Sequence, residues 1–457
     1  MRITFAASLL ALATSAAAMP AKDIQKMSPA ERMAYIKAEK IRLDDERTAA
    51  GVFDLDRYEA HGPAKCEGSK AGEYSCKAMD MMGFIRHQDL GSKSRKGNDV
   101  WGWTSKDGRE FGVVCQTDGA AFIEVLKDGS MVYLGRINTA SSSALWRDAK
   151  VIGDMVYIVA DVSKHGMQVF DMKKLLEADP KSPKVYAKED LVTHFTGFGK
   201  AHNIVANEKT NLVFNVGGDG KCSGKLWAFD VKDPANPKDL GCSAGGSYVH
   251  DAQCVNYDGP DSKYKGKEVC FDFNVNVLVT VDNSDPAKAT QIGSAKYKGS
   301  AYTHQGWVTK GMTHLLLGDE QDEGSNGGNT RTFIFDIKDL ANPKHTGTYV
   351  SKSKAIDHNL YIIDNIAYQS NYATGLRVLD VDSVDKDNTG GGFQEIAYFD
   401  VYPEDDNKNP SISYVGSWSN YPYFKSGYIL VNSMERGIFS VKMHKSALAH
   451  RNGTNFE

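Results

Sequence analysis

The sequence predicts an all-β protein, a seven-bladed β-propeller preceded by a short N-terminal helical segment. Two repeated markers support this fold. One is a strand pattern that ends in an acidic residue, and the other is a triplet that precedes an earlier strand of each unit. The composition agrees, because 43 glycines against 13 prolines, with 10% aromatic residues, suit many strands joined by tight turns.

The strand marker is an apolar run that closes on an acidic residue, often followed by a turn. In Asp233-Pro-Ala-Asn-Pro237 the turn is explicit, because Asp and Asn before proline favour turns and proline does not continue a central strand. The last copy is degenerate. The copies are Phe122-Ile-Glu124, Val169-Phe-Asp171, Ala228-Phe-Asp230, Thr280-Val-Asp282, Ile334-Phe-Asp336, Val378-Leu-Asp380 and Phe439-Ser-Val441.

The triplet marker lies earlier in each unit and is followed by a strand-like run. The central residues of successive triplets are 45, 55, 48, 54, 54 and 61 positions apart. Units of this length with about four strands match propeller blades. Separate sandwiches would need linkers, which are not evident, and a β-helix would need shorter repeats. The triplets are Trp101-Gly-Trp103, Trp146-Arg-Asp148, Ala201-His-Asn203, Val249-His-Asp251, Thr303-His-Gln305, Asp357-His-Asn359 and Trp418-Ser-Asn420.

The N-terminal residues have a different character from the repeats. Arg2, an apolar stretch and Ala16-Ala17-Ala18 indicate an export signal that is too short to span a bilayer. Ser28 and Glu31 have the spacing of a capping box, which predicts an amphipathic helix to about Ala50 that packs on the propeller or contacts a partner. We therefore predict a signal peptide (1–18), a helical extension (19–60), a cysteine-containing lead-in (61–97), the propeller (98–445) and a C-terminal tail (446–457).

Charge and hydropathy exclude some partners and favour an exported protein. The net charge is −4 and the sequence has no basic stripe, which argues against nucleic acid as the main partner. No later segment approaches about 18 unbroken apolar residues, so no membrane span is expected in the mature chain. We expect a secreted, extracellular or periplasmic protein whose partner is a protein, a glycan or a small molecule at one propeller face.

Seven cysteines fit an oxidising compartment. Neighbours in sequence predict three local disulfides: Cys66 with Cys76, Cys222 with Cys242, and Cys254 with Cys270. Other pairings stay open, because six cysteines allow fifteen. Cys115 lies in an apolar strand pattern, which favours a buried, inert thiol.

Taken together, residues 98 to about 442 resemble the choice-of-anchor B secreted proteins, which carry LVIVD-type repeats. The resemblance implies a propeller-like, exported protein and no particular activity. Members often end in a surface anchor, whereas this chain ends at Glu457 without an apolar tail, so free secretion or a periplasmic location is expected. The most specific stretches are Trp146-Arg-Asp148, His165-Gly-Met-Gln-Val-Phe-Asp171, Ala201-His-Asn-Ile204, His250-Asp-Ala-Gln-Cys254, Tyr302-Thr-His-Gln-Gly-Trp307, Asp319-Glu-Gln-Asp-Glu323, Asn329-Thr-Arg331, Asp357-His-Asn-Leu-Tyr361 and Trp418-Ser-Asn-Tyr-Pro422.

Four histidines hold one register position, just before the strand that lines the channel. They are His202, His250, His304 and His358. Four imidazoles facing one axis suit a transition metal, with Asp251 and neighbouring polar residues supporting them. The alternative is that these residues only form hydrogen bonds between blades. The further ligand-binding candidates are Arg147, Asp148, Asn203, Gln305, Asp357, Asn359, Trp307 and Trp418.

A dense acidic run offers a second candidate metal site. Asp319, Glu320, Asp322 and Glu323 provide the oxygen ligands that Ca²⁺ prefers, although the spacing is not that of an EF-hand. The alternatives are a solvated acidic loop or a pair with Arg331.

Two functional hypotheses follow. No nucleophile elbow, H-E-x-x-H, P-loop or dinucleotide fingerprint is present. The first hypothesis is therefore a binding scaffold with a metal or ligand site in the channel, where tryptophans either pack the hub or stack on carbohydrate. The second is a metal-dependent oxidoreductase or hydrolase that uses the axial histidines. The divalent metal in question is calcium or a transition metal.

Overall fold

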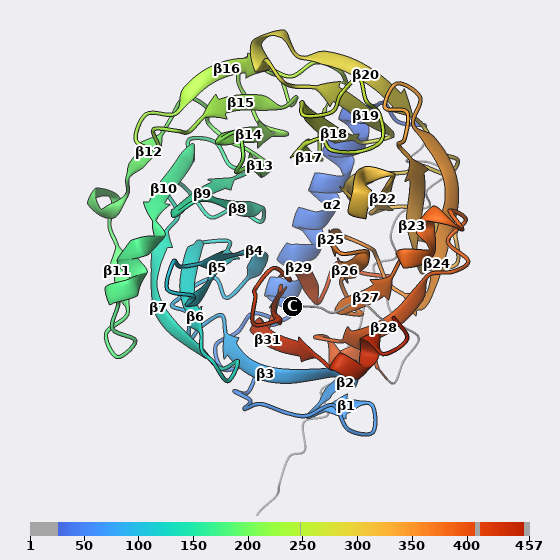
Figure 1. The fold of residues 1–457 in the computed structure, drawn as a ribbon. Helices are drawn as coiled ribbons and strands as arrows, with labels where there is room; N and C mark the ends of the chain where they lie inside the picture. The colour runs from blue at the N-terminus through green and yellow to red at the C-terminus, as the bar shows by residue number, and fades with distance from the viewer. Residues whose placement is uncertain (1–25, 247, 407–411, 452–457) are drawn as a thin grey trace, which may run out of the picture.

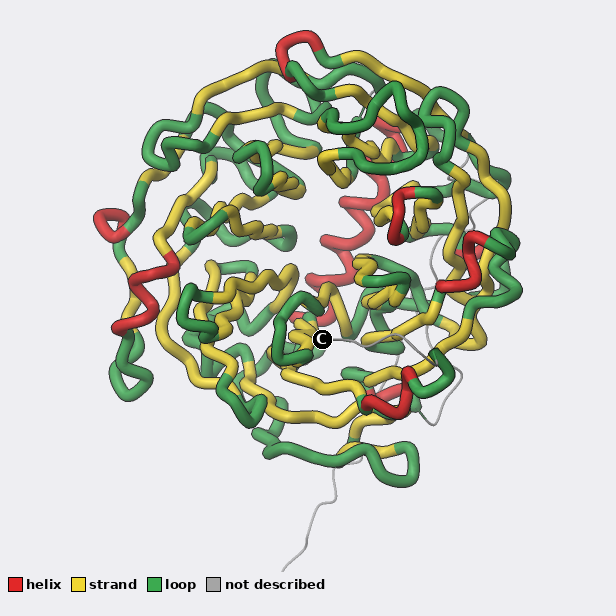
Figure 2. The backbone as a smooth tube through the Cα atoms, viewed as in Figure 1, coloured by secondary structure: helices red, strands yellow, loops and turns green. Residues whose placement is uncertain are grey.

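The chain forms a ring of seven β-sheets around one axis (Figure 1), which confirms the predicted fold class. The structure is a computed structural model, and it describes residues 26–246, 248–406 and 412–451. Strands dominate the ring, and among the described residues one long helix crosses its middle (Figure 2). We number the blades 1 to 7 in chain order of their innermost strands. The predicted signal peptide lies outside the described residues.

The innermost strands overlap the triplet markers, and in three blades the whole triplet lies inside the strand. They are β4 (Gly97–Thr104), β8 (Arg147–Ile152), β13 (Asn203–Asn207), β17 (Asp251–Asn256), β21 (Thr303–Val308), β25 (Asn359–Ile363) and β29 (Ser417–Tyr421). The second strands are β5 (Glu110–Gln116), β9 (Met155–Ala160), β14 (Leu212–Val216), β18 (Glu268–Asn274), β22 (His314–Asp319), β26 (Ile366–Ser370) and β30 (Tyr428–Ser433).

The third strands carry the acidic markers. They are β6 (Gly119–Val125), β10 (Met167–Asp171), β15 (Trp227–Asp230), β19 (Val277–Asp282), β23 (Asn329–Asp336), β27 (Leu376–Asp380) and β31 (Gly437–Met443). The fourth strands are β7 (Met131–Asn138), β12 (Thr193–Phe195), β16 (Lys238–Cys242), β20 (Thr290–Ala295), β24 (Lys344–Lys354), β28 (Gln394–Phe399) and β3 (Met79–Arg86).

Short elements decorate the rim. Three more strands extend two blades: β11 (Lys184–Tyr186) runs parallel to β7, and β1 (Lys70–Ala71) with β2 (Tyr74–Lys77) continues blade 6 beyond β28. The short 3₁₀ helices are η1 (Met172–Glu177), η2 (Lys188–Asp190), η3 (Pro286–Lys288), η4 (Lys310–Met312), η5 (Glu323–Ser325), η6 (Asp382–Asp385), η7 (Pro403–Asp405) and η8 (Lys445–Leu448).

The repeated acidic residue has a local structural role. At the end of β15, the Asp230 carboxylate accepts the backbone N–H of Lys232 at 2.9 Å, and Asp336 accepts that of Lys338 at 2.9 Å after β23. A carboxylate that binds the amide two residues ahead forms an Asx-turn, which ends the strand and turns the chain. The marker is therefore a turn signal rather than a ligand.

The ring closes by pairing the two ends of the propeller sequence. Strand β3 pairs antiparallel with β31, so residues 79–86 supply the outer strand of blade 7. Figure 1 shows the blue β3 beside the red β31. Strand β3 lies upstream of the residues in which the repeats are visible, and it carries neither marker.

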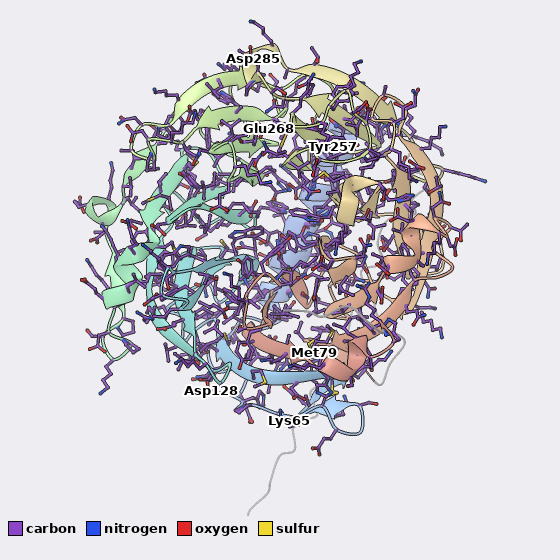
Figure 3. All side chains as sticks on the ribbon, in the orientation of Figure 1. Lys65, Met79, Asp128, Tyr257, Glu268 and Asp285 are labelled. Carbon is purple, nitrogen blue, oxygen red and sulfur yellow. A yellow bond between two sulfur atoms is a disulfide. The ribbon has the colours of Figure 1, made fainter. Side chains whose placement is uncertain are left out.

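Apolar faces of successive blades pack against one another to form the core. Phe122 of blade 1 and Phe170 of blade 2 stack with ring centroids 4.8 Å apart, and both are fully buried. Side chains fill the space between the sheets (Figure 3). Burying such rings supplies about 1.5–3 kcal/mol each, which makes face-to-face blade packing the main stabilising contribution.

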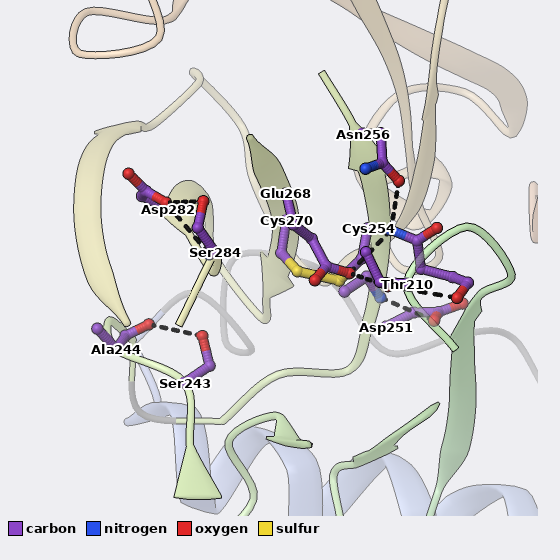
Figure 4. The surroundings of a disulfide bond; sticks show 12 residues. Thr210, Ser243, Ala244, Asp251, Cys254, Asn256, Glu268, Cys270, Asp282 and Ser284 are labelled. Atoms are coloured by element: carbon purple, nitrogen blue, oxygen red, sulfur yellow. Dashed lines mark hydrogen bonds between the residues drawn. A yellow bond between two sulfur atoms is a disulfide. The ribbon is translucent and has the colours of Figure 1, made fainter. Parts of the chain in front are cut away.

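All three predicted disulfides are present: Cys66–Cys76, Cys222–Cys242 and Cys254–Cys270. Cys254 and Cys270 face each other across β17 and β18, close to the Glu268 carboxylate that accepts the Thr210 hydroxyl (Figure 4). Cys115 is free and buried, and burial raises the pKa of its thiol well above the ordinary value. We therefore expect the Cys115 thiol to be unreactive.

The helix α2 (Pro29–Ala49) begins with the predicted capping box. The Ser28 Oγ accepts the Glu31 N–H, and Glu31 in turn accepts the Ser28 N–H at 2.9 Å. The helix runs across the middle of the ring (Figures 1 and 2) and contacts several blades. Within the described residues, no helix combines the length and apolar character needed to cross a membrane.

Candidate functional site

The four predicted histidines meet at one end of the central channel, where the inner strands of blades 3 to 6 begin. Ring centroids are 4.6 Å apart for His202 and His250, 4.1 Å for His250 and His304, and 4.4 Å for His304 and His358. All four are at most 5% exposed. We call this set the histidine cluster. The common register position therefore does bring these side chains together.

Hydrogen bonds orient the imidazoles and assign their tautomers. The Nδ1 of His202 lies 2.9 Å from the Asp161 carboxylate, and the Nδ1 of His250 lies 2.8 Å from the His304 carbonyl. Because both acceptors can only accept, each Nδ1 must donate, which leaves an Nε2 lone pair on each neutral ring. Yet the two Nε2 atoms are 2.9 Å apart. Two lone pairs that face each other repel, so this contact is stabilised by a proton on one of the two rings or by a bound cation.

Helix α2 closes this end of the channel with two lysines. The ammonium of Lys40 is 7% exposed and lies 2.5 Å from Glu320 Oε1, while Lys37 pairs with Asp161. Glu320 lies 3.7 Å from His304 Nε2 and 3.5 Å from His358 Nε2. Burial alone would raise the pKa of Glu320, but the Lys40 charge holds it below its ordinary value. The cluster therefore already contains a fixed cation.

Arg147 does not join the histidine cluster. Its buried guanidinium donates to the Gln116 carbonyl at 2.9 Å and the Thr139 hydroxyl at 2.7 Å, and it contacts His165 at 2.7 Å. Burial lowers its pKa to about 10. This long side chain reaches sideways between blades 1 and 2, so Arg147 contributes to blade-to-blade contacts at its own position.

Most of the polar neighbours join one blade to the next. Asp148 accepts the Ile204 N–H of the following blade at 2.7 Å, and Gln305 accepts the Leu360 N–H at 2.8 Å. Asn203 and Asn359 donate to the carbonyls of His250 and Trp418, at 2.9 and 3.2 Å. These bonds are the blade-to-blade contacts of the structural alternative, and they fix the register of the inner strands.

The acidic run is buried, which corrects the expectation of a solvated loop. Asp319 accepts the Tyr297 hydroxyl and the Ala301 and Tyr302 amides at 2.6–2.7 Å. Asp322 pairs with Arg331 at 2.7 Å, as one alternative predicted. Asp322 and Glu323 lie beside Asp357 of the next blade, with one ligand atom of each within 4.8 Å of the others. Calcium binding here stays a prediction.

The other end of the channel is an open cavity of about 520 Å³. Six aromatic residues line it: Trp101, Trp103, Trp307, Tyr361, Tyr421 and Tyr423. Tyr361 lies 5.6 Å from Trp101 and 5.1 Å from Trp307, measured between ring centroids. We call this cavity the aromatic cavity.

The two predicted tryptophans lie at different ends. Trp307 lines the aromatic cavity, whereas Trp418 packs on His358 with ring centroids 5.0 Å apart. Sequence reasoning missed the three tyrosines as site residues. The available signal was their place one to three residues beyond a repeated triplet: Tyr361 and Tyr421 lie on inner strands, and Tyr423 follows β29.

Polar groups form the floor of the aromatic cavity. The Lys150 ammonium lies 2.5 Å from Asp148 and 4.5 Å from the centre of the Trp101 ring. Burial raises the pKa of Asp251 to about 7, although the nearby Lys150 opposes this. The Gln253 and Gln305 carbonyl oxygens accept amides of the next blade. Within the described residues, their Nε2 amides have no protein partner and therefore face the cavity.

No protein-family model matches this chain, and no curated protein is detectably similar to it.

Proposed function

We propose that this protein is an exported binding scaffold whose aromatic cavity holds a neutral carbohydrate. The observation that carries the proposal is the combination of aromatic walls and a hydrogen-bonding floor in one open cavity. Its volume of about 520 Å³ is in the range of small-ligand sites, which are mostly apolar with a few placed polar groups.

The chemistry of a sugar matches both surfaces. A pyranose has an apolar face of C–H groups and a rim of hydroxyls. Trp307 and Trp101 present flat rings for the apolar face, while the amides of Gln253 and Gln305 can donate to hydroxyl oxygens. Asp251 can accept from a hydroxyl when ionised and donate to one when protonated.

The site is also held rigid before any ligand arrives. Gln253 and Gln305 are oriented by hydrogen bonds to Val308 and Leu360, both at 2.8 Å, on inner strands of the next blade. A preorganised site loses less conformational entropy on binding. Rigidity of this kind favours selective recognition of one sugar geometry.

The test is an array of neutral oligosaccharides followed by calorimetric titration with the best binder. We expect Trp307→Ala to weaken binding at least ~10-fold, since a central aromatic contact is worth more than about 1.4 kcal/mol. The matched control is Trp227→Ala on β15, whose indole binds Asp239 at 2.8 Å outside the cavity. Absence of any glycan binding, or equal loss in both variants, would contradict the proposal.

Transition-metal binding by the histidine cluster is the second candidate function, with a metal-dependent enzyme as its consequence. The Nε2–Nε2 contact of 2.9 Å between His202 and His250 favours it, because a metal ion is one of the two cations that fit there. A bound metal would supply Lewis acidity or an activated water. It ranks second because Lys37 and Lys40 already place positive charge at this end.

Elemental analysis of protein purified without an affinity tag tests this candidate. We expect stoichiometric transition metal that is lost in His250→Ala and retained in His345→Ala, whose ring lies near Thr348 on β24. Metal-free protein whose Tm is unchanged by chelator would instead assign a shared proton to the pair.

We also infer export and membership of the choice-of-anchor B family. Three disulfides support an oxidising compartment. The family assignment rests on the motifs of residues 98–442 and on the seven-bladed ring that they imply. Mass spectrometry of the mature N-terminus after secretion tests the predicted cleavage near residue 18.

A further inference from the structure

Two carboxylates from the acidic run and a third from the next blade converge in the interior. Asp322 and Glu323 follow β22 of blade 5, and Asp357 immediately precedes β25 of blade 6. Their exposures are 0%, 1% and 3%. One oxygen of each lies within 4.8 Å of the others. We call this set the carboxylate trio.

The carboxylate trio has more negative charge than its surroundings neutralise. Arg331 is the only cation within the described residues that pairs with it, through Asp322 Oδ2 at 2.7 Å, and the Asp357 N–H donates to Glu323 at 2.9 Å. Asp322 Oδ1, Glu323 Oε2 and both Asp357 oxygens are buried without a hydrogen-bond partner. An unpartnered buried charge is strongly destabilising, so these oxygens require a proton or a cation.

Asp357 supports a cation site independently of the acidic run. It comes from a different blade than the acidic run, it is 97% buried, and neither of its oxygens has a partner although it points at Glu323 and Asp322. Like charges held this closely are stable only when something positive lies between them.

The neighbours in the same run differ from the trio. Asp319 receives the Tyr297 hydroxyl and three backbone amides, and Glu320 receives Lys40 and the Tyr372 hydroxyl. The histidine cluster likewise has its own lysines. Glu320 Oε2 is also buried without a hydrogen-bond partner, but Lys40 balances the charge of this carboxylate. In the carboxylate trio, by contrast, three carboxyl groups share one cation among the described residues, Arg331.

We propose that the carboxylate trio binds one Ca²⁺ ion that bridges blades 5 and 6. One oxygen of each carboxylate lies within 4.8 Å of the others, and two oxygens on one Ca²⁺ ion can be up to about 4.6–5.2 Å apart, twice the usual metal–oxygen distance. Mg²⁺ demands near-ideal octahedral geometry, whereas Ca²⁺ accepts irregular sets of carboxylate oxygens, so we favour Ca²⁺. A site made of oxygen ligands alone also disfavours zinc and copper. This proposed Ca²⁺ site does not depend on the carbohydrate proposal for the aromatic cavity.

Calorimetry and thermal unfolding of the full chain test the proposal, using CaCl₂, MgCl₂ or EGTA as additives. We expect one Ca²⁺ site per chain and a rise in Tm of ~2–4 °C when Ca²⁺ replaces EGTA, with little effect of Mg²⁺. Asp357→Asn keeps the side-chain shape but removes a charged ligand, so it should abolish both the binding and the Tm shift.

Asp272→Asn is the matched control. Asp272 is 1% exposed, and both its oxygens lack hydrogen-bond partners. Within the described residues, it does not belong to a cluster of possible metal ligands. This variant should keep the Ca²⁺-dependent Tm shift. If Asp357→Asn does not fold, calorimetric titration of the wild type with CaCl₂ still tests whether the site exists. A Tm that is insensitive to Ca²⁺, or a Ca²⁺ shift that persists in Asp357→Asn, would overturn the site and assign protons to the trio.

Discussion

The two ends of the central channel are built from the same seven inner strands but differ in what covers them. At the end where these strands begin, helix α2 covers the histidine cluster and inserts Lys40 against Glu320. At the end where they finish, an aromatic cavity of about 520 Å³ stays open. One end is sealed and charged, and the other is accessible and mostly apolar.

The difference shows that the most conspicuous residues need not form the accessible site. Histidines at a repeated position attract functional interpretation, yet all four are buried and lie under a segment from the far N-terminal side of the chain. In the open cavity, Trp101, Trp307 and Tyr423 are partly exposed. Trp307 and Tyr423 lie outside the repeated triplets. Function assigned from residue type alone would favour the sealed end of the channel over the open one.

The largest expected effect tests whether Lys40 seals the closed end. Lys40→Met should lower the free energy of unfolding by about 3–5 kcal/mol, because Glu320 loses its buried partner. Adding Glu320→Gln should restore part of the loss. Arg42→Met, on the exposed side of α2 beside Glu39 and Glu46, is the control and should leave the denaturation midpoint unchanged. If Lys40→Met is as stable as the wild type, Lys40 does not hold helix α2 over this end of the channel.

The tryptophans at the two ends should also differ in how fast a reagent in solution oxidises them, and we expect this effect to be smaller than that of Lys40→Met. We expect N-bromosuccinimide to oxidise Trp307 at least ~10-fold faster than Trp418, because Trp418 is 6% exposed beneath α2 and reacts only after local opening. Peptide mapping by mass spectrometry measures both rates. Lys40→Met should accelerate Trp418 selectively, and equal rates in the wild type would remove the distinction between the ends.

The smallest effect concerns pH, and it has opposite signs at the two ends. The pKa of Asp251 is about 7 when folded, so the folded state binds more protons than the unfolded state between about pH 4 and 7. Its contribution to stability is therefore lost as pH rises through this window. Burial lowers the pKa of His358 to about 4, so its contribution is lost as pH falls from about 6.5 to 4.

Urea unfolding of Asp251→Asn at pH 4.5 and pH 8 measures the open-end contribution. We expect the variant to gain about 1 kcal/mol on the wild type at pH 8 and nothing at pH 4.5, a value reduced because Asp251 is part-exposed to the cavity and water screens it. His358→Gln should instead gain free energy of unfolding relative to the wild type at acid pH. An unchanged profile in both variants would contradict the assigned environments.

Much of the fold follows from local patterns. The turn-forming acids after the third strands and the triplets that overlap the inner strands are short-range signals, so they predict the seven blades. The disulfides were predictable because each pair is separated by only 10 to 20 residues. Strand β3 escaped prediction because it pairs with β31 across the whole propeller and has no marker of its own.

The site was only partly predictable. The shared register placed the four histidines together, since every blade presents that position to the axis. It did not show that Arg147 extends between blades, that Asp357 meets Glu323, or that Tyr361 and Tyr421 line a cavity. Each of these depends on side-chain direction and on neighbours from another blade.

The amino-acid sequence by itself predicted the number of blades, the three disulfides and the start of helix α2, because hydrophobic alternation, turn residues and helix caps act over a few positions. Only the tertiary structure decided which end of the channel is sealed. The amphipathic pattern of residues 29–49 requires a surface to pack on but does not name it. That choice rests on Lys40 meeting Glu320, 280 residues away, inside the ring.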